Sequence, residues 1–567
     1  MLAKKWLTPL AQLIAFSGAT HARHKLRRFE NQLHHCRLVQ DDLLRNILRL
    51  NQSSDFGRQH RFDHISDYQD FTSAVPPARY DYFKPYIDRC CMGETGALFG
   101  PSQKLIMFAL TSGTTAAVKL IPVTQTTIQR YRNGWNIWGI KALSDHPHAY
   151  LRKILQVSSP AEEYRTEAGI PCGAISGMLS RHQKYIVRQF YATPACLAEI
   201  PDSTARYYTI MRVALTQDIG FISTANPSTT VTLARTAERY APQLIRDLHD
   251  GTIDKSISLA PEIRDQITPR LKPSPQRARQ LQNILDENNA LLPSDYWDIA
   301  FLANWTGGTL SMYLPQLKKY FGDAPLRDIG LLASEGRMSI PLVDNTSAGV
   351  LDINANFYEF VPAAEIDRHA PDDTTSTLPA GLTVLRAEEL QKGELYYIFL
   401  TNFSGLYRYH IGDLVGVTDH IGTTPVIEFL SKGAHTSSIT GEKLTENQVV
   451  QAVQAAAAQL NLSLGTFIMA PHWGPVPYYL VSFESDRSFT AAELKQIAHN
   501  IDAQLCQNNI EYESKRKSSR LGHVQIRQLP HDTITQQDQK LRAARQGRSE
   551  QFKHRFLYNQ PFELDRP

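Results

Sequence analysis

Apolar residues recur at helical spacing in the first part of the chain. Between residues 24 and 54 they stand three or four positions apart (among them Leu26, Phe29 and Leu33), which predicts an amphipathic helix. Residues 66–71 start a second, short helix, and Val75-Pro-Pro77 ends it. The aromatic stretch at 80–87 predicts core packing.

From residue 100 to about 430, short apolar runs alternate with helical patterns. Asn226-Pro227 is typical of a helix start, and this helix runs to Gly251 with a break or kink at Pro242. Residues 252–300 are polar and helical, and 407–413 are expected to form a loop at a strand end. The runs that predict strands are 105–110, 154–158, 207–214, 220–225, 329–332, 357–361 and 395–402. Such alternation predicts α/β layers.

The pattern changes after residue 430. Residues 431–435 form a polar joint that contains a glycine, and beyond it a helix is expected at 445–460, a strand at 478–483 and a helix at 491–507. This part is about 130 residues long, an ordinary domain size. We therefore expect a large multi-sheet α/β domain at 1–430, a hinge at 431–435 and a small mobile α+β domain at 436–567.

Composition supports a folded protein with several domains. The chain has 567 residues, 42% of them hydrophobic, with 24 Tyr and 23 Phe, so it is long enough for two or more packed cores. Lys and Arg total 60 against 56 acidic residues, so no overall charge indicates nucleic acid. Residues 515–556, however, hold eleven Lys and Arg against three acids. This basic stretch is either a solvated face or a surface that closes over an anionic ligand.

The cysteines and the N-terminus bear on location. None of the six cysteines forms a Cys-x-x-Cys pair, which argues against a disulfide framework and a zinc site and favours a cytoplasmic location. No apolar run approaches the roughly 18 residues of a membrane helix, so stable membrane insertion is not expected. Residues 4–22 loosely imitate a signal peptide, but Pro9 and Gln12 interrupt the apolar segment. Its continuation into the pattern from residue 25 favours a first amphipathic helix.

The candidate chemistry begins at a loop that follows the apolar run 105–110. Thr111-Ser-Gly-Thr-Thr-Ala-Ala-Val-Lys119 offers backbone N–H groups, an ammonium group and the hydroxyls of Thr111, Ser112, Thr114 and Thr115. Such a loop suits a polyphosphate, although it lacks the Gly-Lys-Ser/Thr ending of a Walker A loop. The alternative is an ordinary surface turn.

Four further signals are weak when each is taken alone. Glu335, in Ser334-Glu-Gly336, is expected at the end of a parallel strand, where a carboxylate beside a triphosphate suits Mg²⁺. Asp413 could accept hydrogen bonds from both hydroxyls of a ribose, or it is a turn residue. Lys443 precedes a helix cap at Thr445, and Lys553 is one of several basic residues near the chain end.

Taken in order, these motifs resemble the adenylate-forming superfamily. More narrowly, the chain resembles the Gretchen Hagen acyl acid–amido synthetase family, whose plant members conjugate auxin, jasmonate or benzoates to amino acids. The narrower resemblance covers roughly residues 40–560. It rests on stretches such as Lys84-Pro-Tyr-Ile-Asp, Phe357-Tyr-Glu-Phe-Val-Pro and Leu505-Cys-Gln-Asn-Asn-Ile-Glu-Tyr512.

The resemblance implies a large N-terminal domain with a mobile C-terminal lid, ATP with Mg²⁺, and two half-reactions through an acyl-adenylate. It also implies small carboxylic acid and amino acid substrates, and we expect a monomer. The loop residues Thr111, Ser112, Thr114, Thr115 and Lys119 would then cover the phosphates. The other implied roles are Mg²⁺ binding for Glu335 beside Ser334, adenine contact for Tyr358, ribose binding for Asp413, and neutralisation of the α-phosphate for Lys553.

The chain departs from the pattern of these relatives at two places. Ala116-Ala117 stands where their loop usually has a glycine, which restricts positive-φ conformations. Lys432 stands where the superfamily usually has an arginine that reaches the ribose, and lysine keeps the charge but not the fork geometry.

Three functions remain open at this point. The favoured one is an ATP-dependent ligase that joins an acid to an amino acid through an acyl-AMP. The alternatives are transfer of the acyl group to a thiol such as coenzyme A, and a weakly active scaffold with the same fold. Residues 120–310 are expected to line the acid pocket, with Tyr164, Arg165 and the loop 305–313 as candidates.

Overall fold

The structure is a computed structural model, and it describes residues 22–111, 119–181, 185–369, 375–432, 436–440, 442, 444–462, 464–473, 476–544 and 554–562. The chain forms two compact units. The larger unit contains the described residues up to Trp305, together with Lys318–Ile411 and Val415–Phe429. The smaller unit contains Thr306–Leu317, Gly412–Leu414 and the described residues from Leu430 onward. The hinge predicted at 431–435 stays a prediction.

The larger unit begins with helices, as the spacing of apolar residues predicts. Residues 22–32 are helical, and a 3₁₀ turn, η1 (Leu33–His35), separates them from α2 (Cys36–Asn51). The predicted stretch at 80–87 lies in α5 (Tyr80–Cys91), where Tyr80, Phe83 and Ile87 are buried. The core packing expected there is therefore confirmed. The short elements nearby are α3 (Asp55–Gln59), η2 (Phe62–His64), α4 (Tyr68–Ala74) and η3 (Thr95–Ala97).

A four-stranded sheet brackets the predicted phosphate loop. Its order is β2-β1-β5-β4, and β1 pairs antiparallel with β2 so that Thr111 lies opposite Lys119. Thr124 then caps α6 (Gln125–Asp145), because its hydroxyl accepts the backbone N–H of Thr127 at 3.2 Å. The strands are β1 (Leu105–Thr111), β2 (Lys119–Thr124), β4 (Tyr164–Arg165) and β5 (Pro171–Gly173).

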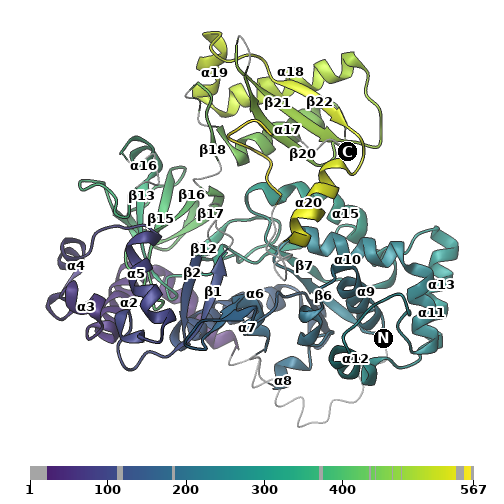
Figure 1. Cartoon of the computed structure of the whole chain (residues 1–567), viewed down its shortest axis with the longest axis horizontal. Helices are drawn as coiled ribbons and strands as arrows, with labels where there is room; N and C mark the ends of the chain where they lie inside the picture. Colours follow the sequence, from purple (N-terminus) through teal and green to yellow (C-terminus); the bar gives the residue numbers. More distant parts are fainter. Residues whose placement is uncertain are drawn as a thin grey trace. The chain divides into compact units, whose positions relative to one another are not determined.

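A second four-stranded sheet is parallel throughout, in the order β3-β6-β7-β8. Helices α9, α10, α11 and α13 pack against one another beside it (Figure 1). The strands are β3 (Lys153–Gln156), β6 (Ile219–Ser223), β7 (Phe301–Asn304) and β8 (Leu326–Asp328). The connecting elements are η4 (Pro147–Ala149), α7 (Ile175–Arg181), α8 (Tyr185–Arg188), η5 (Ala195–Glu199), α9 (Ser203–Ala214), α10 (Pro227–Arg239), α11 (Ala241–Asp250), α12 (Pro261–Ile267), η6 (Thr268–Arg270), α13 (Pro275–Asn288), α14 (Pro293–Tyr296) and α15 (Leu314–Phe321).

Two predicted strands of this region are wrong. Residues 207–214 form the end of α9, in which all ten residues from Ala205 to Ala214 are buried. A helix buried on every side shows no polar stripe, so its apolar run resembles a buried strand. Residues 329–332 are not a strand either, because β8 ends at Asp328 and β9 begins only at Leu332.

The hairpin β9 (Leu332–Ala333) and β10 (Gly336–Arg337) replaces the arrangement expected for Glu335. The two strands pair antiparallel, and Ser334 and Glu335 form the turn between them. The prediction that Glu335 ends a strand of a parallel sheet is therefore wrong. The hairpin nevertheless follows β8, the last strand of the parallel sheet, by a few residues.

The third large sheet has seven strands, in the order β11-β12-β17-β16-β15-β13-β14. Asp413 lies inside β16 (Tyr409–Ile421), so the predicted strand-end loop at 407–413 is wrong for residues 409–413. The other strands are β11 (Ser339–Ile340), β12 (Gly349–Leu351), β13 (Phe357–Pro362), β14 (Leu385–Arg386), β15 (Leu395–Thr401) and β17 (Thr424–Lys432), with α16 (Ala363–His369) and η8 (Ala387–Glu389) between them.

The smaller unit packs helices against a three-stranded sheet, in the order β20-β21-β22. The helices predicted at 445–460 and 491–507 are α17 (Glu446–Gln459) and α18 (Ala491–Asn508), and each begins with a capping box. The predicted strand at 478–483 is β21 (Tyr478–Glu484). The remaining elements are η7 (Gly308–Tyr313), β18 (Thr436–Ser437), β19 (Leu444–Thr445), β20 (Phe467–His472), α19 (Ile510–Lys517), β22 (Gln525–Leu529) and α20 (Thr533–Ala544).

Candidate functional site

The Glu335 hairpin, residues 332–337, is held in place by neutral hydrogen-bonding groups. Tyr131 in α6 donates its hydroxyl hydrogen to the carbonyl oxygen of Ala333 at 2.6 Å. The side-chain amide of Asn402 donates to the carbonyl oxygen of Glu335 at 2.9 Å. The hydroxyl of Tyr409 lies 3.4 Å from Oε1 of Glu335. Glu335 is only 5% exposed, so its carboxylate occupies a defined position rather than a solvated loop.

Asn402 was not singled out by the sequence, and the structure gives it a central position. It is buried directly after β15. Its Oδ1 accepts the backbone N–H groups of Ser404 at 2.9 Å and Leu406 at 3.3 Å. The residue therefore ties the turn 402–406 to the backbone of Glu335. The available signal was a polar residue at the end of an apolar strand.

Gly336 and Arg337 fix the second strand of the hairpin. A Cβ atom at Gly336 would meet the side-chain amide of Asn356 at 2.7 Å, so this position needs glycine for close approach. Arg337 is fully buried and donates to the carbonyl oxygens of Ile329 at 2.6 Å and Ser339 at 3.1 Å. Its guanidinium lies 4.8 Å from the ring of Trp135.

A buried carboxyl group lies near this arginine. Burial lowers the pKa of Arg337 to about 10 and raises the pKa of Asp352 to about 6. In each case the charged form loses hydration, and the opposite charge nearby offsets part of that loss. The second strand of the hairpin therefore lies in an interior that contains two buried ionisable groups.

Tyr358, predicted to contact adenine, lies in β13 and is only 1% exposed. Its hydroxyl donates to the carbonyl oxygens of Arg337 at 2.9 Å and Asp352 at 3.2 Å. These contacts place the ring in the core beside the Glu335 hairpin. Its contact with adenine stays a prediction.

Asp413 and Lys432, the two residues expected near the ribose, contact each other. Lys432 Nζ lies 3.2 Å from Oδ1 of Asp413, and the Asp413 side chain is 6% exposed against 44% for Lys432. The carboxylate is thus fixed by its strand, whereas the lysine reaches it from a half-exposed position. A ribose hydroxyl would share this carboxylate with the ammonium group.

The predicted phosphate loop is described only at its ends. Lys119 begins β2, and its Nζ lies 5.4 Å from the centre of the Tyr80 ring. The hydroxyl of Tyr80 in turn accepts from the backbone N–H of Leu120 at 2.9 Å, which anchors this strand. Outside the described residues lie Ser112, Thr114, Thr115, Ala116, Ala117, Lys443 and Lys553, together with the side chain of Thr111.

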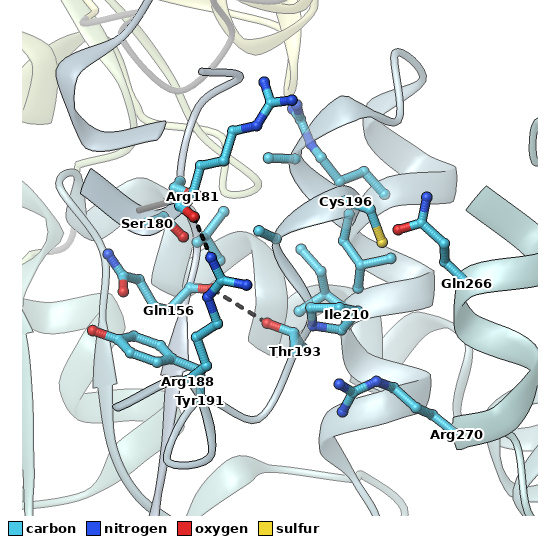
Figure 2. Close-up of a pocket in the computed structure, with 17 residues that line it drawn as sticks. Gln156, Ser180, Arg181, Arg188, Tyr191, Thr193, Cys196, Ile210, Gln266 and Arg270 are labelled. Atoms are coloured by element: carbon cyan, nitrogen blue, oxygen red, sulfur yellow. Dashed lines mark hydrogen bonds between the residues drawn. The ribbon is translucent and has the colours of Figure 1, made fainter. Parts of the chain in front are cut away.

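The larger unit also contains a pocket of about 640 Å³, shown in Figure 2. It opens beside the end of β3 and is lined by residues of α7, α8, η5, α9, α12 and η6. None of the acid-pocket candidates, Tyr164, Arg165 and the loop 305–313, is among its lining residues. Their role stays a prediction.

Three domain models of one protein family together match most of the chain. The GH3 family N-terminal domain matches residues 25–326, the central domain 349–432 and the C-terminal domain 447–561. The chain belongs to the GH3 family. The family resemblance drawn from the sequence motifs is therefore confirmed.

Curated GH3 relatives span the chain at low identity. A jasmonoyl–L-amino acid synthetase GH3.5 from Oryza sativa subsp. japonica is 25% identical over 540 residues, covering 90% of each chain. An indole-3-acetic acid-amido synthetase GH3.10 from Arabidopsis thaliana is 25% identical over 469 residues, covering 77% of each. The solved structure of the GH3.15 acyl acid amido synthetase superposes with a TM-score of 0.79 at 20% identity, covering 92% of this chain and 91% of that one. This likeness shows that the chain has the fold of a GH3 acyl acid amido synthetase.

None of the helices described is both long and apolar enough to cross a membrane. Within the same part of the chain, no group of three or more His, Cys, Asp or Glu side chains is placed to hold a metal ion. All six cysteines lie in the described part of the chain and are free.

Proposed function

We propose that this protein is an ATP-dependent acyl acid–amido synthetase. It adenylates a carboxylic acid to an acyl-AMP and transfers the acyl group to the amine of an amino acid, releasing pyrophosphate and AMP. The observation that carries the proposal is the match to all three GH3 domains from residue 25 to residue 561. The buried Glu335 hairpin and the names of the curated relatives, which join acids to amino acids, support it.

The chemistry explains why a fixed carboxylate is useful. The carboxylate of the acid substrate is a poor acyl donor and must first be activated. It attacks the α-phosphorus of ATP, and pyrophosphate leaves. That displacement needs in-line positioning and charge stabilisation more than acid–base catalysis. We assign Mg²⁺ binding to Glu335, because Mg²⁺ is commonly held by one or two carboxylates together with substrate phosphates and water. When bound, Mg²⁺ would offset the negative charge of the phosphate oxygens.

The remaining roles are proposed from the family motif. Asp413, with Lys432 beside it, would bind the ribose, and its nearly buried carboxylate is suited to accept from hydroxyl groups. Ser334 adjoins Glu335 in the turn. Phosphate contact is assigned to Thr111, Ser112, Thr114, Thr115 and Lys119. The adenine role of Tyr358 rests on the motif alone.

The experiment that tests the proposal is a screen of carboxylic acids for ATP–pyrophosphate exchange by the full chain. We expect at least one acid to support exchange, and then to give an amide product by mass when an amino acid is added. A coenzyme A thioester instead of an amide would indicate acyl transfer to a thiol. Absence of exchange with every acid, at saturating ATP and Mg²⁺, would indicate the scaffold.

We further propose that the small domain, from about residue 436, closes for adenylation and rotates for amide formation, about the joint at 431–435. The two steps need different groups around the same acyl carbon and α-phosphorus, and hinge motion is a common way to exchange them. Lys553 would act in the first step, where charge builds on the α-phosphate. We also propose that the protein is a monomer and that it acts in the cytoplasm.

Single-turnover kinetics of Lys553→Ala test this division of labour. We expect acyl-AMP formation to slow by about a hundredfold or more, as for loss of one preorganised charge stabiliser. The same variant, given preformed acyl-AMP and an amino acid, should form amide at nearly the wild-type rate. Equal losses in both steps would show that Lys553 is structural or that the small domain does not alternate.

A further inference from the structure

The pocket of Figure 2 lies at one edge of the parallel sheet, away from the Glu335 hairpin. Its wall begins at Gln156, the last residue of β3, whereas the hairpin follows β8 at the opposite edge. Three strand spacings, about 14 Å, separate these two edges. No residue of the hairpin lines the pocket, and neither Asn402 nor Tyr409 does so. The pocket is therefore distinct from the Glu335 hairpin.

Four arginines from four separate elements line this pocket. They are Arg181 at the end of α7, Arg188 at the end of α8, Arg206 in α9 and Arg270 at the end of η6. None of the 17 lining residues drawn in Figure 2 is an aspartate or a glutamate. The lining residues therefore include four positive side chains and no carboxylate, a composition that favours an anionic ligand.

The position of some of these arginines at helix ends explains part of this cluster. An arginine in the last turn of a helix can bond the terminal carbonyl groups, and Arg188 does so by donating to the carbonyl oxygen of Arg181 (Figure 2). Arg206 is different, because it lies in the first turn of α9, where the helix dipole disfavours a cation. It is also only 1% exposed, so this arginine is fixed within the pocket wall.

Neutral polar groups complete the lining. Ser158, Ser180 and Tyr191 contribute hydroxyl groups, which can donate to an anion without adding charge. Burial raises the pKa of Cys196, so this thiol stays protonated and does not compete with an anion. Glu199 also raises that pKa, but it is not among the lining residues.

We propose that this pocket binds a small organic anion with two or more carboxylate or phosphate groups. Guanidinium groups pair with both kinds of group through two parallel hydrogen bonds, which explains the use of arginine rather than lysine. A volume of about 640 Å³ is in the range of pockets that hold metabolite-sized molecules. The site goes beyond the proposed ligase reaction and does not depend on it.

Isothermal titration of the full chain, without ATP or Mg²⁺ and at low salt, tests the proposal directly. Citrate serves as a probe with carboxylates only, and a hexose bisphosphate as a probe with phosphates only. We expect at least one probe to bind, and the stronger one identifies the chemistry of the ligand. Failure of both probes to bind at millimolar concentration would overturn the proposal.

Two charge-removing variants locate the binding. Arg181→Gln and Arg270→Gln alter exposed side chains of different elements, and we expect each to weaken binding by about tenfold, which is about 1.4 kcal/mol. Arg279→Gln in α13 is the matched control, because Arg279 is also exposed but does not line the pocket. If Arg279→Gln weakened binding equally, the loss would come from the general surface charge of the protein, and the proposal would be overturned. Because the titration needs no catalysis, its failure and the failure of the proposed ligase are separate results.

Discussion

The Glu335 hairpin and the arginine-lined pocket place charge in two different ways. In the hairpin, Tyr131 and Asn402 donate to backbone carbonyl oxygens at 2.6 and 2.9 Å, and the Tyr409 hydroxyl lies 3.4 Å from the buried Glu335 carboxylate. In the pocket, three of the four cations stand on exposed side chains, and only Arg206 is buried. The first arrangement fixes one charge relative to reacting atoms, whereas the second selects a ligand by its total charge. Substitutions in the hairpin should therefore affect rate, and substitutions in the pocket should affect affinity.

The largest effect is expected for Glu335→Gln. This change removes the proposed Mg²⁺ ligand while keeping the size of the side chain, so pyrophosphate exchange should fall by about a hundredfold to a thousandfold. The measurement is acid-dependent exchange at limiting Mg²⁺, with thermal unfolding to verify the fold. Glu394→Gln, at an exposed position before β15, is the control. Unchanged exchange would refute the metal assignment.

Asp413→Ala comes next. Charge-assisted hydrogen bonds contribute about 1.5–3 kcal/mol, so the affinity for ATP should fall by roughly tenfold to a hundredfold. Direct ATP titration measures this. Lys432→Ala removes the half-exposed partner and should weaken ATP less than Asp413→Ala does, because an exposed ammonium group is screened by water. ATP affinity equal to wild type in Asp413→Ala would show that this residue only stabilises its strand.

Asn402→Ala should cost about tenfold in exchange rate, because the hairpin loses a buried hydrogen bond to Glu335. The decisive readout is the Mg²⁺ concentration at half-maximal rate, which should rise if Asn402 positions the metal ligand. Ser404→Ala is the matched control, since its buried hydroxyl contacts Thr127 at 3.1 Å and not the hairpin. If both variants lose rate without any change in Mg²⁺ dependence, Asn402 is merely structural.

The smallest effect is expected for Tyr409→Phe. At 3.4 Å its hydroxyl makes a long contact with Glu335, so exchange should fall by no more than about threefold. Both variants are measured in one assay, and their losses in exchange rate are compared. The ratio shows whether the rate depends more on the Asn402 bond to the hairpin backbone or on the Tyr409 contact with the carboxylate. A larger loss in Tyr409→Phe would reverse that order.

Much of the fold could be predicted from local patterns. The spacing of apolar residues located α17 and α18, and the capping residues Thr445 and Thr490 marked where they begin. The failures came where burial removes the pattern. Helix α9 is buried along nearly its whole length, so its run of apolar residues predicts a strand although the segment is helical.

The candidate site also contains residues that the sequence identifies and residues that only the structure reveals. Glu335, Asp413 and Lys432 follow from the order of the motifs along the chain and from the family resemblance, and the structure places Lys432 beside Asp413. No local motif marks Asn402 or the four arginines of the pocket, because their neighbours come from distant parts of the chain. Asn402 and Glu335, for example, are 67 positions apart in the sequence.

The sequence by itself determined the family and the residues with candidate chemistry, because the order of short motifs along the chain is visible without a structure. It also determined the helices of the small unit, because apolar spacing and capping depend on residues close together in the chain. Only the tertiary structure decided that Glu335 stands on an antiparallel hairpin, that Asp413 lies inside a strand, and that Arg206 lines one pocket with three other arginines. These features depend on long-range packing and on which polar groups can be buried together. Such pairings follow from the arrangement of whole sheets, and no local pattern of residues specifies them.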